Sequence, residues 1–196
     1  MAEISVEQIK KLKELSGAGL TDAKKALVEA DGDFDKALEA MRKKGLTKAE
    51  KRGDRETREG LVESYIHDGR LGAIVEVNCE TSFVAKTDEF KTLAHQIAMQ
   101  VASMAPLYVS EEDIPEEVRT AKMQELEANF KGPEKMKEQI LAGQVKKAFS
   151  DRVLMNQPYI LDDSKTVEQF IKEAIAKTGE NITVRQFKRI ELGVTE

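Results

Sequence analysis

The fold of this chain is decided by the stretch Val75-Glu76-Val77-Asn78-Cys79-Glu80-Thr81-Ser82-Phe83-Val84-Ala85-Lys86, where an apolar strand ends in a polar turn. Phe83 and Val84 stand in that turn, directly before a segment with strong helical periodicity. A large aromatic ring at such a turn either fills the protein's own core, burying about 150–250 Å², or contacts another protein. The sequence leaves both alternatives open.

The strand before this turn belongs to a predicted β-hairpin. Residues 61–67 and 71–78 are rich in Val, Ile and Tyr, and Asp68-Gly69-Arg70 separates them. An Asp-Gly pair readily adopts the positive φ angles of a tight hairpin turn. A last segment of alternating apolar and polar residues, 181–191, is expected to join the hairpin in an antiparallel sheet.

Helices are predicted on the other side of the turn. Thr87 or Asp88 can cap the first of them, and its apolar residues keep a 3.6-residue period as far as Pro106. This helix is expected to pack across the hairpin. Paired helices with exposed surfaces are expected as an excursion over residues 111–157.

The first 45 residues are predicted to form a compact module of three short helices. The expected N-caps are Ser5, in a capping box with Gln8, then Thr21 or Asp22, and then Asp33. Gly45 is expected to end the third helix. The residues expected to face the core of the module are Ile9, Leu12, Leu15, Ala23, Ala26, Leu27, Ala30, Phe34, Ala37, Leu38 and Met41.

Three parts are therefore expected along the chain. Residues 1–45 form the helical module, which is near the lower size limit for independent folding. Residues 46–59 are rich in charged side chains and are expected to be a solvated, partly helical linker. Residues 60–196 form an α+β core, in which helices flank a small antiparallel sheet.

The composition argues against several classes of protein. The chain has 196 residues and a net charge of -5, whereas nucleic-acid binding depends on a concentrated basic surface. The single cysteine cannot form an internal disulfide, and the first residues do not resemble a secretory signal, so a cytoplasmic location is expected. No segment reaches the roughly 20 apolar residues that cross a bilayer.

Catalytic and metal-binding sites find little support in the residue pattern. His67 and Cys79 lie on neighbouring predicted strands, which suggests a thiol nucleophile with a general base. No carboxylate is placed to orient His67, however, and no helix start is placed to activate Cys79. Two separate histidines and one cysteine do not supply a tetrahedral metal site. The carboxylates expected to complement a helix dipole are Glu111, Glu112, Asp113, Glu116 and Glu117.

Three separate segments carry a resemblance to one protein family. They are Gly17-Ala18-Gly19-Leu20-Thr21-Asp22-Ala23-Lys24-Lys25-Ala26-Leu27, Val77-Asn78-Cys79-Glu80-Thr81-Ser82-Phe83-Val84-Ala85 and Gly179-Glu180-Asn181-Ile182-Thr183-Val184-Arg185. In this order they closely resemble the signature segments of bacterial elongation factor Ts. The resemblance implies a ubiquitin-associated-like three-helix module and an α+β core. It also implies a guanine-nucleotide exchange factor for the translation GTPase elongation factor Tu, without covalent chemistry. No cofactor and no metal are expected for the chain.

The same resemblance implies which turn acts on the GTPase. Thr81, Ser82, Phe83 and Val84 occupy the family's Thr-Asp-Phe-Val segment. The aromatic ring of that segment wedges between helices of the GTPase and disturbs its magnesium and phosphate sites. Ser82 stands where the family usually has Asp, so it can hydrogen-bond there but contributes no negative charge.

Contacts of the N-terminal module and of a second subunit are also implied. Leu20, Thr21 and Lys24 fall where the family's module meets the nucleotide-binding domain, and Thr21 replaces an often apolar residue. Short members of the family, with one copy of the core, resemble homodimers. The edge of the last strand, 182–192, is the expected dimer contact, and it contains no cysteine for an intersubunit disulfide.

Two other classes of function stay open. In the first, the protein is an adaptor, and residues 1–45 capture a ubiquitin-like or helical ligand that the core presents. In the second, it is a small thiol enzyme that uses Cys79 and His67. Binding by residues 1–45 alone would identify the adaptor, and full activity of a Cys79→Ala variant would eliminate the enzyme.

Overall fold

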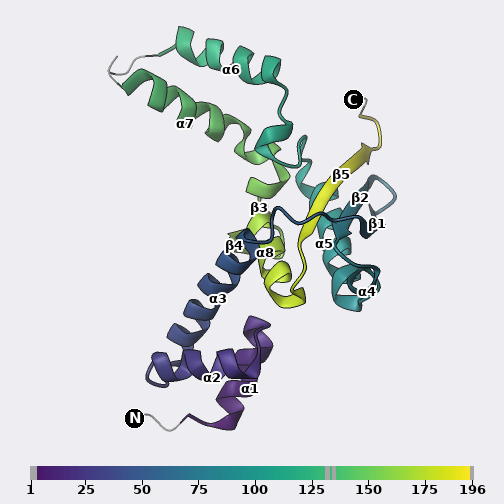
Figure 1. The fold of residues 1–196 in the computed structure, drawn as a ribbon. Helices are drawn as coiled ribbons and strands as arrows, with labels where there is room; N and C mark the ends of the chain where they lie inside the picture. The colour runs from purple at the N-terminus through teal and green to yellow at the C-terminus, as the bar shows by residue number, and fades with distance from the viewer. Residues whose placement is uncertain (1–3, 131–132, 134–135, 195–196) are drawn as a thin grey trace. The chain divides into compact units, whose positions relative to one another are not determined.

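A computed structural model describes residues 4–130, 133 and 136–194 of the chain (Figure 1). Three helices come first, and a small antiparallel sheet with helices follows, which confirms the predicted α+β class. Short 3-10 turns cover Glu111–Asp113, Ser150–Arg152 and Leu154–Asn156. The helices and strands in chain order are α1 (Val6–Ser16), α2 (Leu20–Glu29), α3 (Phe34–Glu50), β1 (Glu59–His67), β2 (Leu71–Cys79), α4 (Ser82–Ala85), α5 (Asp88–Met104), α6 (Glu116–Ala128), α7 (Lys137–Phe149), β3 (Pro158–Tyr159), β4 (Asp162–Thr166), α8 (Val167–Thr178) and β5 (Ile182–Glu191).

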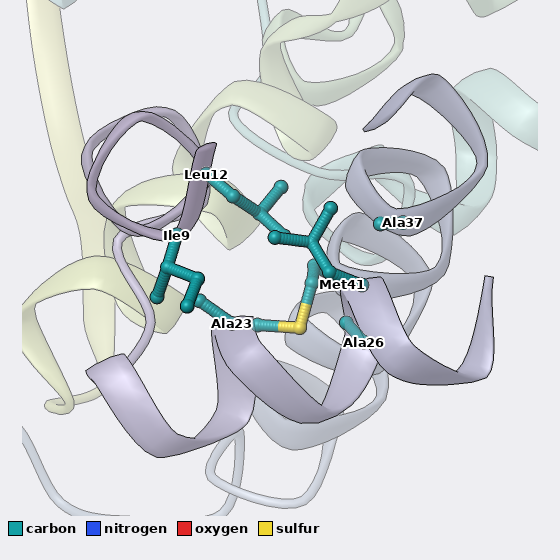
Figure 2. Close-up of a cluster of buried hydrophobic side chains, with 7 residues drawn as sticks. Ile9, Leu12, Ala23, Ala26, Ala37 and Met41 are labelled. Carbon is teal, nitrogen blue, oxygen red and sulfur yellow. The ribbon is translucent and has the colours of Figure 1, made fainter. Parts of the chain in front are cut away.

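Helices α1, α2 and α3 enclose one apolar cluster. The predicted capping box is present, since Gln8 N donates to Ser5 Oγ at 3.1 Å and Ser5 N donates to Gln8 Oε1 at 3.0 Å. Asp33 caps α3 by accepting a hydrogen bond from Lys36 N at 3.1 Å. The buried side chains of the cluster are Ile9, Leu12, Ala23, Ala26, Leu27, Ala37 and Met41 (Figure 2).

The start of α2 differs from the prediction. Gly19, in an extended conformation, is the N-cap, and no side chain caps the helix. Thr21 and Asp22, the predicted caps, therefore lie inside the first turn, where the Asp22 carboxylate complements the helix dipole. Leu15, which was expected to face the core, is 54% exposed, because it lies in the last turn of α1, after the buried part of that helix.

Helix α3 runs five residues beyond Gly45, its predicted end. A Cβ atom on Gly45 would lie only 3.1 Å from the Cβ atom of Ala176 in α8, and Ala49 in the next turn is buried. Gly45 therefore permits close packing of two helices and does not terminate α3. As a result, α3 extends into the segment that the charge pattern predicts to be a linker.

The sheet has the strand order β1-β2-β5, so the last strand joins the hairpin as predicted. Asp68 and Gly69 have φ values of 49° and 65°, and Arg70 N donates to His67 O at 2.9 Å, which confirms the tight Asp-Gly turn. Alternate apolar residues of β2 are buried, namely Ala73, Val75, Val77 and Cys79, and the polar Asn78 is buried beside the last two.

Helix α5 contacts the sheet through side chains of both edge strands. His95 Nδ1 lies 3.7 Å from Glu63 Oε1 in β1, and Arg189 Nε in β5 donates to Ala102 O at 2.9 Å. Thr87, one of the two predicted caps, accepts a hydrogen bond from Phe90 N at 3.2 Å. The buried face of α5 consists of Phe90, Leu93, Ala94, Ile97, Ala98, Gln100, Val101 and Ala102.

The predicted helical excursion contains the paired helices α6 and α7 (Figure 1). No residue of α6 is buried, and the apolar cluster at the base of the pair is formed by Ile114, Val145, Phe149 and Val153. A polar contact fixes the chain after α7, since the buried Gln157 donates to Met104 O at 3.2 Å and to Asp151 O at 2.7 Å. The small sheet of β3 and β4 that follows was not predicted.

The chain divides into two compact units. The first unit comprises Met1–Glu63, Glu76–His95 and Gln169–Val184, and the second comprises Ser64–Val75, Gln96–Glu168 and Arg185–Glu196. The turn that carries Phe83 lies in the first unit. The separation into a module, a linker and a core, at 1–45, 46–59 and 60–196, stays a prediction.

Candidate functional site

Phe83 is the most exposed of the large apolar side chains in the described part of the chain, at 79%. It lies in α4, a helix of only four residues between β2 and α5. Val84 and Ala85, the next two residues of the same turn, are buried. The turn is therefore anchored by its small apolar residues and presents the aromatic ring to solvent, which excludes burial of the ring in the protein's own core.

Two threonines cap the ends of this turn. Thr81 Oγ1 accepts a hydrogen bond from Val84 N at 3.4 Å, so Thr81 is the N-cap of α4. Thr87 Oγ1 donates to Val84 O at 2.8 Å and also caps α5. Both backbone polar groups of Val84 are thus satisfied locally, which allows its side chain to be buried.

The turn is also held by a distant segment, the loop between α8 and β5. Glu180 Oε2 accepts a hydrogen bond from Thr81 N at 3.0 Å, and Glu180 Oε1 accepts one from Thr81 Oγ1 at 2.6 Å. In the opposite direction, Glu80 Oε1 accepts a hydrogen bond from Asn181 N at 2.6 Å. We call these four residues, Glu80, Thr81, Glu180 and Asn181, the carboxylate clamp.

A third segment is attached to the carboxylate clamp. Asn181 Nδ2 donates to Gly53 O at 3.1 Å and to Arg55 O at 2.8 Å. Arg55 Nη1 lies 3.4 Å from both carboxylate oxygens of Glu80. Three segments far apart in the sequence, which follow α3, β2 and α8, therefore meet at Glu80 and Thr81, shortly before Phe83 in the chain.

The residues of a possible thiol site are not brought together. Cys79 is the last residue of β2 and is fully buried, and its Sγ donates to Thr81 O at 3.3 Å. Burial, together with the charge of Glu180, raises the pKa of the Cys79 thiol to about 11, which keeps it protonated near neutral pH. His67 is the last residue of β1, beside the hairpin turn, and hydrogen-bonds Tyr65 Oη at 3.0 Å.

Thiol labelling tests this environment. At pH 8 the native protein is expected to react with an aromatic disulfide reagent about 100-fold or more slowly than the unfolded chain, because the thiolate is scarce and the sulfur is inaccessible. The absorbance of the released chromophore, with and without denaturant, gives the two rates. Equal rates would contradict the burial of Cys79.

The acidic residues before α6 are used within the fold. Asp113 Oδ2 accepts hydrogen bonds from Ser110 N at 2.8 Å and from Ser110 Oγ at 2.9 Å. Hydrogen bonds from Asn156 and from Lys146 lower the pKa of Glu111 from its ordinary value. Within the described ranges, no three side chains of His, Cys, Asp or Glu are grouped so that they could hold a metal ion.

The candidate contact residues of the N-terminal module lie on α2. Leu20, Thr21 and Lys24 are all exposed, and their spacing places them close together on one side of the helix. Ala23, Ala26 and Leu27 occupy the buried side (Figure 2). The three candidate residues are therefore available for contact with a partner.

Comparison with known proteins shows which family the sequence belongs to. A sequence model of the family described as Elongation factor TS matches residues 5–194. The chain belongs to the elongation factor Ts family. Elongation factor Ts of Thermotoga maritima is 52% identical over 193 residues, which are 97% of each chain. Elongation factor Ts of Moorella thermoacetica is 50% identical over 194 residues, 97% of this chain and 96% of the relative. Elongation factor Ts of Rippkaea orientalis is 51% identical over 199 residues, 98% of this chain and 80% of the relative.

Sequence reasoning missed the residues that support the turn in this member of the elongation factor Ts family. Glu180 and Asn181 stand in one of the segments that carry the resemblance, but nothing in their spacing shows that they contact Glu80 and Thr81, about 100 residues earlier. The sequence offered one indication only: Glu80 and Thr81 lie in one of the three family segments, and Glu180 and Asn181 lie in another. In the part of the chain that the structure describes, no helix is long and apolar enough to cross a membrane.

Proposed function

We propose that this protein is the guanine-nucleotide exchange factor of elongation factor Tu and promotes GDP release from that GTPase during polypeptide elongation in the cytoplasm. The observation that carries the proposal is Phe83, a large ring that is 79% exposed on a turn held from three segments. Exposing such a ring gives up the free energy of its burial, which at about 25 cal/mol per Å² is several kcal/mol for an aromatic side chain. A contact with a partner explains why the fold keeps it outside.

The proposed mechanism is thermodynamic linkage. A factor that binds the nucleotide-free GTPase more tightly than the GDP form weakens GDP binding by the same free energy. Phe83 supplies this difference by wedging between helices of the GTPase, next to its magnesium and phosphate sites. The reaction makes or breaks no covalent bond and needs no cofactor of the factor itself.

Ser82 is the residue of the turn that stands where the family usually has a charged Asp. It is exposed and directly precedes Phe83, but its hydroxyl carries no charge that could repel a phosphate or attract the magnesium ion. Displacement of magnesium therefore depends on the wedge of Phe83, with Thr81 and Val84 holding the turn in place. The ubiquitin-associated-like module of residues 1–45 contributes separate contacts to the nucleotide-binding domain through Leu20, Thr21 and Lys24.

The release rate of a fluorescent GDP analogue from elongation factor Tu tests the proposal. With magnesium and excess unlabelled GDP present, catalytic amounts of the protein are expected to accelerate release strongly, because each molecule dissociates and acts again. The absence of acceleration, with a folded factor and an active GTPase, would overturn the proposal. Binding experiments with residues 1–45 would then test the adaptor alternative.

A homodimer is part of the same proposal, and one face of the sheet supports it. Ile74 lies between the buried residues Ala73 and Val75, so its side chain points to the opposite face of β2. Ile190 likewise follows Arg189, whose side chain contacts α5. This second face carries several exposed apolar side chains, namely Ile66 at 71%, Ile74 at 48%, Ile190 at 75% and Leu192 at 62%.

Such a group of exposed apolar side chains is typical of a protein contact. Because β5 stands at the edge of the sheet, its outer edge and this apolar face can together meet a second copy of the chain. The proposed dimer contact therefore includes the edge of the last strand, which the resemblance implies, together with the exposed apolar side chains on this face of the sheet.

The substitution Ile190→Lys is expected to convert the dimer into a monomer, because it places a charge in the centre of an apolar contact. Sedimentation equilibrium should give a mass near 21.9 kDa for the variant and about twice that value for the wild type. Leu161→Lys, which changes an exposed apolar residue in the turn between β3 and β4, is the matched control and should remain dimeric. Equal masses for Ile190→Lys and the wild type would remove this face from the contact.

A further inference from the structure

We propose that Glu180, supported by Glu80, is a positioning residue for nucleotide exchange: its carboxylate fixes the backbone of the turn and thereby the direction of the Phe83 ring. This inference rests on the proposed exchange function. It extends that function to Glu180, which lies about 100 positions after the turn in the sequence. The argument depends on the size of α4, on the contacts of Thr81 and on the charges around the clamp.

A helix as short as α4 cannot hold its own orientation. Its backbone hydrogen bonds include Ala85 N to Thr81 O at 3.2 Å, Lys86 N to Phe83 O at 3.3 Å and Thr87 N to Val84 O at 3.0 Å, and one helical turn of this kind is not stable by itself. The Phe83 ring adds little, since it is 79% exposed and makes few contacts. Its direction is therefore set by the residues on either side of it in the chain.

On the C-terminal side the anchor is apolar, and on the N-terminal side it is the carboxylate clamp. Glu180 binds both donors of Thr81, the backbone N–H at 3.0 Å and the hydroxyl at 2.6 Å. Because the hydroxyl donates to Glu180, its lone pairs remain directed toward Val84 N, the capping contact of α4. Removing the carboxylate frees the hydroxyl to rotate and loosens the first turn of the helix that carries the ring.

Glu80 makes the clamp reciprocal. It accepts the backbone N–H of Asn181 at 2.6 Å, so the residue next to Thr81 holds the residue next to Glu180. Arg55 lies beside Glu80 and offsets its charge, which lets two glutamates point into the same region. Hydrogen bonds to charged acceptors are shorter and stronger than neutral ones, so this pair of contacts suits a function in which the turn has to withstand insertion into another protein.

The kinetic test separates positioning from stability. The GDP-release rate is measured against increasing concentrations of the factor, which gives a plateau rate and a half-saturating concentration. For Glu180→Ala we expect the plateau to fall about tenfold or more, since a misplacement of about 1 Å of an acting group can cost on the order of 100-fold, while the half-saturating concentration stays within about twofold. A purely structural defect would lower the folded fraction, which raises the half-saturating concentration and leaves the plateau unchanged.

Two further variants sharpen this test. In Glu180→Gln the amide oxygen can still accept from Thr81 N, and the amide N–H can donate to the Thr81 hydroxyl. This conservative variant is therefore expected to keep the plateau within about threefold of the wild type. Glu112→Ala, which removes an exposed carboxylate from another part of the chain, is the matched control and should not change the plateau.

A spectroscopic readout tests the positioning without the GTPase. The chain contains no tryptophan, so Phe83→Trp introduces a single tryptophan at the turn, which can be excited at a wavelength that the tyrosines do not absorb. Time-resolved anisotropy of this variant is expected to show restricted local motion, and adding Glu180→Ala should increase the amplitude of the fast motion about twofold or more. Adding Glu112→Ala should leave it unchanged.

The outcomes are distinguishable. If the wild type accelerates GDP release and Glu180→Ala has the same plateau, or if its anisotropy decay is unchanged, the positioning role is overturned and the exchange function stands. If the wild type itself does not accelerate release, the exchange function fails first. A lower plateau, an unchanged half-saturating concentration, recovery in Glu180→Gln and greater motion of the Trp together establish Glu180 as a positioning residue.

Discussion

Phe83→Ala is expected to reduce the stimulated rate of GDP release by about 30-fold or more. A buried aromatic anchor at the centre of a protein contact is commonly worth about 2 kcal/mol or more, and 2 kcal/mol corresponds to roughly 30-fold in rate. The effect should appear in the plateau rate, because the wedge acts on the difference between the GDP-bound and nucleotide-free states. Stopped-flow release of a fluorescent GDP analogue at saturating factor measures it.

The same substitution should leave the factor itself almost unchanged. Because the Phe83 ring is 79% exposed, its removal costs little buried surface, and surface changes of this kind usually stay within about 0.5 kcal/mol. For a chain of this size that is a shift of about 2 °C or less in Tm. Calorimetry of the two proteins checks this part of the prediction.

A matched control excludes a general effect of losing apolar surface. Leu161→Ala removes an exposed apolar side chain from the turn between β3 and β4, where no contact with the GTPase is proposed, and it should exchange GDP at the wild-type rate. If Phe83→Ala also retained the wild-type plateau, the wedge assignment would be lost, and the source of the linkage energy would have to be sought in Leu20, Thr21 and Lys24.

Features that depend only on residues close together in the sequence were predicted correctly. The turn at Asp68-Gly69 was correct because the pair's intrinsic preference for positive φ agrees with the hairpin around it. The capping box of Ser5 and Gln8 was correct for a similar reason, since both partners lie within one helical turn. In these places local preference and the overall fold point to the same structure.

Predictions failed where a distant contact overrides a local preference. Glycine often follows the last residue of a helix, but Gly45 lies within α3, where its missing side chain leaves room for the close approach of Ala176. The position of Phe83 shows the same limit at the site. The sequence placed an aromatic residue in a turn, yet its exposure depends on the burial of Val84 and Ala85, and the support of the turn depends on Glu180.

Gly60→Ala is expected to destabilise the protein by about 3–5 kcal/mol and to lower its Tm by about 10 °C or more. Gly60 in β1 has a φ of 154°, a conformation that side chains with a Cβ rarely adopt. An added Cβ would lie 2.2 Å from Val77 O and 2.8 Å from Asn78 Cα in β2. Both atoms belong to the backbone of β2 near the end of the hairpin that lies away from its turn, so neither can move without disturbing the pairing of the strands.

Two other glycines of the same hairpin provide graded controls. A Cβ on Gly69 meets no atom within 4 Å, so Gly69→Ala pays only for its φ of 65°, about 1–2 kcal/mol. On Gly72 the nearest atom, Tyr65 O, would be 3.8 Å away, an ordinary contact, and Gly72→Ala should be close to neutral. Thermal unfolding followed by circular dichroism should therefore give the highest Tm for Gly72→Ala, a lower Tm for Gly69→Ala and the lowest Tm for Gly60→Ala. Equal melting of all three would show that the close approach at Gly60 does not exist in solution.

The damage at Gly60 should also reach the exchange reaction. Val77 and Asn78, the residues that the new Cβ would displace, are followed directly by Cys79, Glu80 and Thr81. A shift of this end of β2 therefore moves one half of the carboxylate clamp while Glu180 stays with the other segment. At a temperature where the variant is still folded, we expect its plateau rate of GDP release to fall together with that of Glu180→Ala, because both changes separate the same two sides of the clamp.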